Sequence, residues 1–111
     1  MARTIIVVQT VATSGVSPTQ TTGHTDGNKF NNDGKQFVRA YNSNVGAKTI
    51  TFIAAGTSGD EPVTDRVVSI GASAAKYIGP FPPETFNNSS KQVDIDYEAF
   101  ADMEVEILTL P

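Results

Sequence analysis

Residues 76–88 have the sequence Lys-Tyr-Ile-Gly-Pro-Phe-Pro-Pro-Glu-Thr-Phe-Asn-Asn, in which three prolines follow a short apolar segment. Proline fixes φ and has no backbone N–H, so none of the three can lie inside a hydrogen-bonded central strand. The stretch therefore predicts a rigid, architectural corner that links two sheets. We expect its two phenylalanines to insert into the core from either side of the Pro-Pro pair. The predicted corner comprises Gly79, Pro80, Phe81, Pro82, Pro83 and Phe86.

Outside the corner, short β-branched or alternating segments are separated by turn signals. Strands are expected over residues 4–8, 36–41, 48–54, 66–70, 76–78, 92–97 and 103–109. Alternation places Val93, Ile95 and Tyr97, and likewise Met103, Val105 and Ile107, towards the interior. No apolar period of 3.6 residues stands out. Only residues 98–102 could hold a helical turn, and they fit a loop between the last two strands better. The 111-residue chain is thus expected to be one all-β domain. We expect a compact β-sandwich or a small jelly-roll-like barrel of about seven or eight short antiparallel strands.

Two hairpins follow from this pattern. Segment 36–41 should pair with 48–54, and segment 92–97 with 103–109. The second pairing would set Asp96 opposite Glu104 and Asp94 opposite Glu106 on one face. Because opposed like charges destabilise a strand pair, such a face must be solvated, or matched by a basic partner surface or a Ca²⁺ ion.

Residues 10–28 are rich in Thr, Ser, Gly and Gln. A connection of this length inside a small domain is usually functional or disordered. The alternatives are a long mobile connection and an extended arm that docks on a neighbouring molecule. In the second case, the candidate contacts are Val16, Pro18, Thr19 and His24.

Composition narrows the functional classes. The formal net charge of −4 disfavours binding to nucleic acid or to an anionic membrane. The chain has no cysteine, and its N-terminal apolar run is too short for a signal peptide or a membrane span, so we expect synthesis in the cytoplasm. No catalytic, phosphate-binding or dinucleotide motif surrounds the single histidine, His24. The sequence predicts no enzyme, no cofactor and no metal centre.

Several motifs, taken in order, resemble a family of small structural proteins of tailed bacteriophages, encoded near the major capsid gene. They are residues 6–11 (Ile-Val-Val-Gln-Thr-Val), 15–19 (Gly-Val-Ser-Pro-Thr), 27–34 (Gly-Asn-Lys-Phe-Asn-Asn-Asp-Gly), 37–42 (Phe-Val-Arg-Ala-Tyr-Asn), 65–68 (Asp-Arg-Val-Val), 78–81 (Ile-Gly-Pro-Phe) and 86–87 (Phe-Asn). The last strand differs, because it carries Glu104 and Glu106 where family members have a more neutral, valine-rich strand.

This resemblance implies a non-enzymatic virion component, most specifically a capsid decoration (cement) protein. Such a protein binds the outside of the major capsid lattice and stabilises the head. It often forms a homotrimer and reaches neighbouring capsid subunits with an arm, here residues 10–28. The implied location is the exterior of the virion, after synthesis in the host cytoplasm.

Two other functions stay open. A head-to-tail connector or tail-tube component would also be small, β-rich and non-catalytic. A carbohydrate-binding β-sandwich would use exposed aromatic rings, such as Tyr41, Tyr77 or Tyr97, as stacking platforms, although the chain has no tryptophan.

Overall fold

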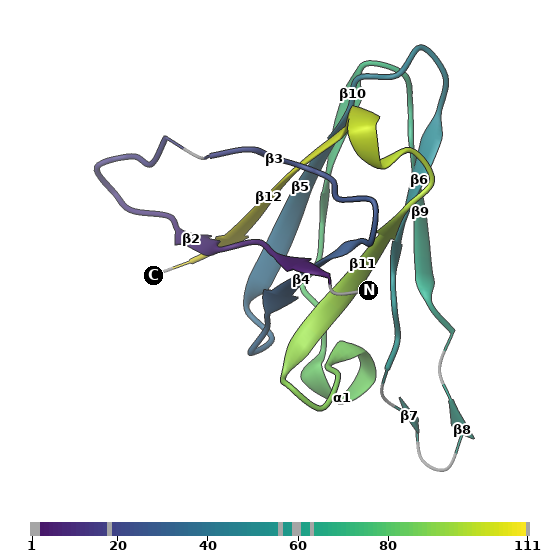
Figure 1. Cartoon of the computed structure of the whole chain (residues 1–111). Coiled ribbons are helices and arrows are strands. Elements are labelled where there is room, and N and C mark those ends of the chain that lie inside the picture. Colours follow the sequence, from purple (N-terminus) through teal and green to yellow (C-terminus); the bar gives the residue numbers. More distant parts are fainter. Residues whose placement is uncertain (1–2, 18, 56, 59–60, 63, 111) are drawn as a thin grey trace.

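The chain forms two five-stranded sheets that pack face to face, as the computed structural model in Figure 1 shows. It describes residues 3–17, 19–55, 57–58, 61–62 and 64–110, without the side chains of 57, 58, 61 and 62. Sheet A contains, in spatial order, β1 (Thr4–Ile5), β4 (Asn28–Asn31), β11 (Gln92–Tyr97), β6 (Lys48–Phe52) and β9 (Arg66–Ile70). Sheet B contains β10 (Ala74–Ile78), β5 (Gln36–Asn42), β12 (Met103–Thr109) and β2 (Val8–Thr10), with β3 (Thr21–Thr22) also paired to β12. The expected all-β sandwich is confirmed.

Four short elements of the described chain lie outside the two sheets. Strands β7 (Thr57–Ser58) and β8 (Glu61–Pro62) pair with each other between β6 and β9. The helices α1 (Pro83–Phe86) and η1 (Phe100–Asp102) span four and three residues. Both are far too short to cross a bilayer.

Short connections carry the chain from one sheet to the other, so both predicted hairpins are wrong. β5 lies in sheet B between β10 and β12, whereas β6 lies in sheet A between β11 and β9. In the same way β11 belongs to sheet A and β12 to sheet B, joined by η1. A turn between two amphipathic strands can let them pair, or let their apolar faces meet across the core. Here the second arrangement occurs.

The N-terminal strands correct a second expectation, that all pairs are antiparallel. β1 is parallel to β4, and β2 is parallel to β12. The chain crosses from the edge of sheet A to the edge of sheet B at Ile6 and Val7. Ile6 is buried, whereas Val7 is 75% exposed. This single straight segment therefore closes one side of the sandwich without a hairpin turn.

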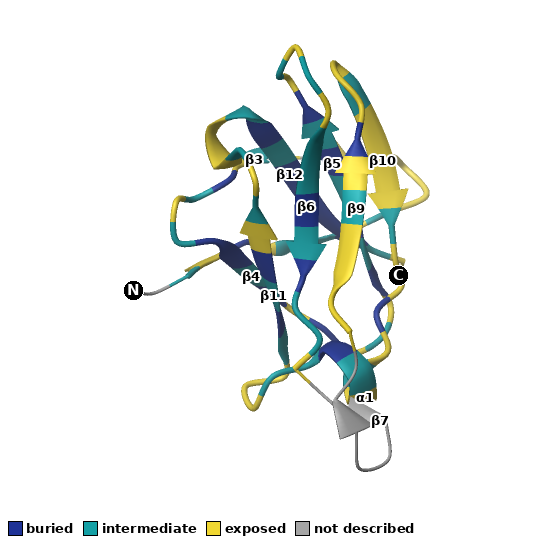
Figure 2. Ribbon diagram, turned by 90° about the vertical axis from the view of Figure 1, so that its right-hand side faces the viewer, coloured by how far each residue is buried: buried dark blue, intermediate teal, exposed yellow. Residues whose placement is uncertain are grey.

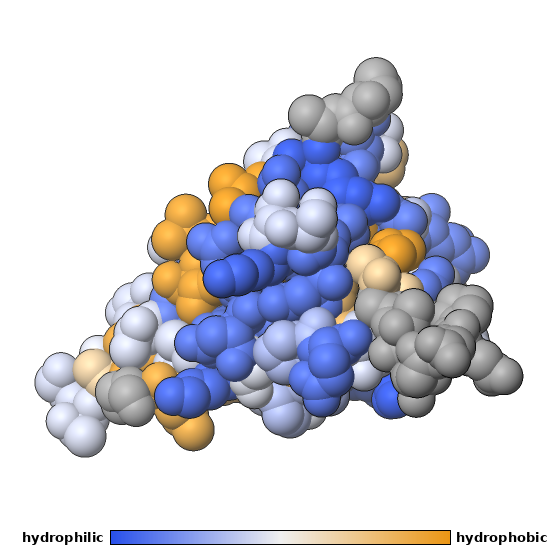
Figure 3. Space-filling view, turned by 90° about the horizontal axis from the view of Figure 1, so that it is seen from below, coloured by the Kyte–Doolittle hydropathy of each residue, from blue (hydrophilic) through white to orange (hydrophobic). Residues whose placement is uncertain are grey.

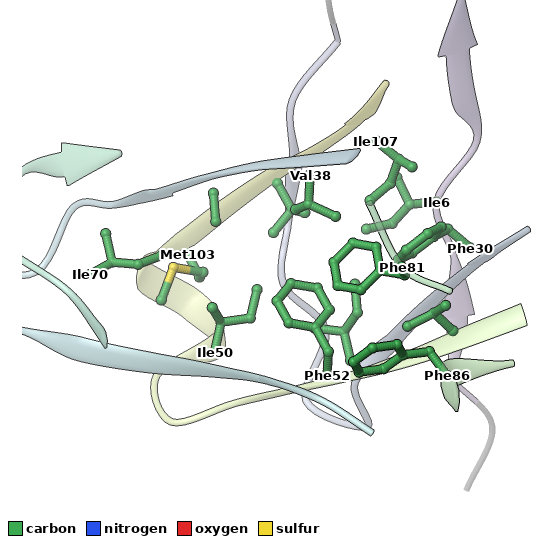
Figure 4. Packing of buried hydrophobic residues seen from close by; sticks show 14 residues of the cluster. Ile6, Phe30, Val38, Ile50, Phe52, Ile70, Phe81, Phe86, Met103 and Ile107 are labelled. Atoms are coloured by element: carbon green, nitrogen blue, oxygen red, sulfur yellow. The ribbon is translucent and has the colours of Figure 1, made fainter. Parts of the chain in front are cut away.

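The core lies between the sheets and is centred on Phe81. Its ring packs at 4.7 Å from Phe52, 5.3 Å from Phe86 and 5.7 Å from Phe30, measured between centroids (Figure 4). The inward residues predicted on β11 and β12, Val93, Ile95, Met103, Val105 and Ile107, are all fully buried. Figure 2 shows buried residues on the facing sides of the strands, and many exposed residues on β9 and β10 at the sandwich edge.

The proline-rich stretch is the predicted corner, since it joins β10 of sheet B to β11 of sheet A. Phe81 and Phe86 are 2% and 8% exposed, which confirms that both enter the core. A turn of helix, α1, was not expected here. It begins at Pro83, whose fixed φ suits the first helical position and whose missing N–H costs nothing there. Another turn, η1, does lie within residues 98–102.

Candidate functional site

A loop of residues 11–20 projects from sheet B (Figure 1, purple to blue). Both of its ends are fixed on β12, because β2 precedes it and β3 follows it. Gln9 connects the two ends of the loop. Its side-chain amide donates a hydrogen bond to the Thr19 carbonyl at 2.9 Å and accepts one from the Thr19 N–H at 2.8 Å. The N–H of Val11 donates to the Thr109 carbonyl. The loop is therefore presented by the rigid sandwich at a defined place.

The tip of this loop is exposed. A turn closes it, in which the N–H of Gly15 donates to the Ala12 carbonyl and Gly15 has a φ of +94°. Val16 is the apolar side chain at the tip and is 38% exposed. Thr19 is exposed as well. Pro18, the fourth predicted contact, lies outside the described residues. The described residues of the loop thus offer a mainly polar surface on which Val16 is an exposed, larger apolar side chain.

The predicted arm is shorter than expected, because residues 21–28 belong to the body of the domain. His24 lies in a turn, where its Nδ1 accepts a hydrogen bond from the Asp26 N–H at 3.1 Å. The backbone N–H of His24 donates to Oδ1 of Asn28, which is fully buried. His24 therefore shapes the turn before β4 and lies away from the tip of the loop.

The predicted cluster of four carboxylates does not form, because its two strands lie in different sheets. Asp94 and Asp96 share the outer face of β11 with Arg3 of the N-terminal segment. The Arg3 guanidinium donates to Asp96 Oδ1 and to the Ile95 carbonyl, and its Nε lies 3.8 Å from Asp94 Oδ1. The predicted alternatives were a solvated face and a cation from a partner or a metal ion, whereas here a cation of the chain itself lies against these two carboxylates.

The other two acidic residues lie on the outer face of sheet B. Glu104 is opposite Tyr41 of β5, and Glu106 is opposite Arg39. Arg39 Nη1 donates to Glu106 Oε1 at 3.0 Å. The Glu106 side chain is only 3% exposed, although it faces away from the core. In the described part of the chain, no three His, Asp or Glu side chains gather to hold a metal ion.

The tyrosines proposed as stacking platforms differ in position. Tyr97 is directed inwards as expected, and its hydroxyl donates to Asn28 Oδ1 at 2.7 Å. Burial raises the pKa of this hydroxyl above its usual range, while Arg3 opposes the shift. Tyr77, on edge strand β10, is 70% exposed. It lies beside Arg39, a residue that sequence analysis did not single out as functional. The sequence feature that could have indicated Arg39 is the alternation of Phe37, Arg39 and Tyr41, which places these side chains on one face of a strand.

A separate hollow of about 550 Å³ lies at the N-terminal crossing between the sheets. Its lining includes Ile5 and Val7, which are 45% and 75% exposed. Seen from the end of the molecule below β1 and α1, polar residues cover the middle of the surface and apolar residues lie towards its sides (Figure 3).

Comparisons of the chain with protein-family models, with curated proteins and with solved structures gave no match.

Proposed function

We propose that this chain is a structural protein of a tailed-phage virion, a decoration protein that binds the outside of the major capsid lattice. The family resemblance supports this function, and the observation that carries it is the 11–20 loop. A preformed loop loses less conformational entropy on binding than a disordered segment does. Its two ends on β12 direct it away from the sandwich, so it can reach a neighbouring subunit.

The contact surface assigned to the capsid is this loop, with Val16 at its tip and Thr19 at its base. The acidic residues are not included, because Asp94, Asp96 and Glu106 are matched by arginines of the chain itself. A homotrimer is the expected assembly, in which each copy would direct one loop onto the lattice.

The direct test is binding of purified protein to expanded capsids that lack it, followed by thermal unfolding of the capsids. We expect saturable binding at many places over the shell and a higher capsid melting temperature. Val16→Asp should weaken binding, because it places a charge on the apolar contact point. Val45→Asp is the matched control, since Val45 is 97% exposed in the turn between β5 and β6.

Three outcomes would contradict the proposal. The first is no binding, and the second is binding that leaves capsid stability unchanged. The third is a single ring of copies at one vertex, which would favour the head-to-tail connector instead. Equal loss of binding in Val16→Asp and Val45→Asp would remove the loop from the contact surface.

A further inference from the structure

The outer face of sheet B carries an aromatic and ionic row that crosses three strands. Tyr77 of β10 is opposite Arg39 of β5, which is opposite Glu106 of β12. The next row along the strands pairs Phe37 with Leu108. Side chains that alternate with the core residues thus form a continuous surface, away from the tip of the 11–20 loop.

This surface is hollowed at its centre. A hollow of about 420 Å³ is lined by Gln20, Arg39, Tyr77, Glu106 and Leu108. Sites for small molecules commonly have volumes of about 300 to 1,000 Å³ and combine apolar walls with a few polar groups. This hollow has the volume and the mixed lining of such a site.

Glu106 is incompletely paired within the described chain. Its Oε1 accepts the hydrogen bond from Arg39, whereas its buried Oε2 accepts none from the described residues. A buried carboxylate oxygen without a donor is costly, so a donor from a ligand would be strongly favoured. Arg39 is 28% exposed, and the bond to Glu106 uses one of its five N–H groups. Glu106 can therefore accept a hydrogen bond from a ligand, and Arg39 can donate one, at adjacent positions.

Tyr77 supplies a flat apolar wall beside this pair. Tyr77 is 70% exposed, and its ring centroid lies 6.2 Å from that of Phe37, at an interplanar angle of 49°. Phe37 thus supports one side of the ring and leaves much of it free. An exposed aromatic ring on an edge strand is available to a ligand without any change in the core.

The chemistry of the ligand follows from these three groups. Because Arg39 and Glu106 neutralise each other, the hollow does not select a strong net charge. It selects neighbouring groups that each donate and accept, together with a flat apolar face. Adjacent hydroxyls on a pyranose ring have the first property, and the C–H face of the same ring has the second.

We propose that this hollow binds a saccharide unit, with its apolar face on Tyr77 and two adjacent hydroxyls on Arg39 and Glu106. Gln20 also lines the hollow, and because Glu106 Oε2 is buried, binding requires a neighbouring side chain to move so that a hydroxyl can reach this oxygen. The hollow includes Gln20 from the end of the 11–20 loop but neither Val16 nor Thr19, so a failure of capsid binding would not by itself contradict this inference.

The test is a glycan array, followed by NMR titration of the ¹⁵N-labelled chain with methyl glycosides of glucose, galactose, mannose and N-acetylglucosamine. We expect array binding and shift changes centred on residues 39, 77 and 106. Nα-acetyl-arginine amide and Nα-acetyl-lysine amide serve as probes of a protein partner. If the residues of the hollow showed NMR shift changes with these amides and none with the glycosides, the saccharide proposal would be wrong. The result would indicate a basic protein surface as the ligand instead.

Two variants locate the site. Tyr77→Ala should reduce saccharide affinity by about tenfold or more, because it removes the stacking surface. Phe100→Ala is the matched control, since Phe100 is an exposed aromatic, 41% exposed, that does not line the hollow. Glu106→Gln should also weaken binding, and its amide spectrum will show whether the sheet is intact. Absence of binding by every glycan, or equal loss in Tyr77→Ala and Phe100→Ala, would overturn the proposal.

Discussion

The side-chain amide of Asn32 donates a 2.9 Å hydrogen bond to the backbone carbonyl of Phe81. Asn32 follows β4, and Phe81 lies in the proline-rich corner, 49 residues further along the chain. The same amide donates to Asn87 Oδ1, and Asn87 returns a bond to the Asn32 carbonyl. The turn after β4 is thus hydrogen-bonded to the proline-rich corner, and these bonds hold the corner over the core.

Replacing Asn32 by alanine should destabilise the fold by about 1 to 3 kcal/mol, because it leaves a buried carbonyl without its donor. Asn32 is only 5% exposed, so water cannot readily replace the amide. Urea denaturation gives the free energy of unfolding. Asn31→Ala is the control, because this neighbouring side chain is exposed and should change stability by less than about 0.5 kcal/mol. Equal losses of stability in the two variants would show that the hydrogen bonds of Asn32 to the corner contribute no more than an exposed side chain does.

Truncation of Phe81 to alanine should cost about 3 to 5 kcal/mol, since its ring contacts three other phenylalanines at the centre of the core. Phe86→Ala should cost a similar amount, reduced slightly by its 8% exposure. Both values come from chemical denaturation. Phe100→Ala, on the exposed η1 turn, should have little effect. A loss near zero for Phe81 would mark the corner as a contact surface instead of a core element.

Gly27 should tolerate alanine much less well than Gly15. Both have a positive φ, +86° and +94°, which costs an L-residue about 1 to 2 kcal/mol. A Cβ on Gly27 would also lie 2.5 Å from the Ile95 carbonyl oxygen and would meet the Arg3 guanidinium, whereas a Cβ on Gly15 meets none of the described residues within 4 Å. We expect Gly27→Ala to lose about 1 to 3 kcal/mol more than Gly15→Ala, measured by thermal or urea unfolding. Similar losses would show that the N-terminal segment moves away freely.

Tyr97 should make stability fall at alkaline pH. Burial raises the pKa of its hydroxyl in the folded chain, whereas the unfolded chain ionises near pH 10. Above about pH 10 the unfolded state therefore binds fewer protons than the folded state, and stability is lost at up to about 1.4 kcal/mol per pH unit.

Urea denaturation from neutral to alkaline pH, compared with Tyr97→Phe, isolates this contribution. The variant should lose about 0.5 to 1.5 kcal/mol at neutral pH, because the bond to Asn28 disappears, and should show a shallower alkaline decline. Parallel pH profiles for the two proteins would contradict the assignment.

Alternation and turn chemistry predicted which residues face the core. Val93 and Ile95 on β11, and Met103 and Val105 on β12, are buried as expected, because the period of two leaves each strand only one apolar face. The same pattern did not predict pairing. Strands 92–97 and 103–109 satisfy it equally well as a hairpin and as facing strands of two sheets. The cluster of four carboxylates was predicted from the hairpin pairing, which is the wrong one of these two arrangements.

The candidate sites also combine features that the sequence predicted with features that depend on the tertiary structure. The polar composition of residues 10–28 indicated either a mobile connection or a docking arm, and only the pairing of its two ends with β12 limits the projecting part to residues 11–20. His24 was selected as the single histidine, whereas its contacts make it part of a turn. Arg39 and Glu106 are far apart in sequence, so their contact beside Tyr77 depends on the antiparallel pairing of β5 with β12.

The sequence by itself determined the fold class, the inward faces of the strands and the place of the corner at residues 76–88. These features depend on local properties: the fixed φ of proline, β-branched side chains and the two-residue strand period. The tertiary structure decided which strands are neighbours, that Arg3 pairs with Asp96 and lies near Asp94, and that Phe81 becomes the centre of the core. These depend on contacts between distant residues, which form only when both sheets bury their apolar faces together.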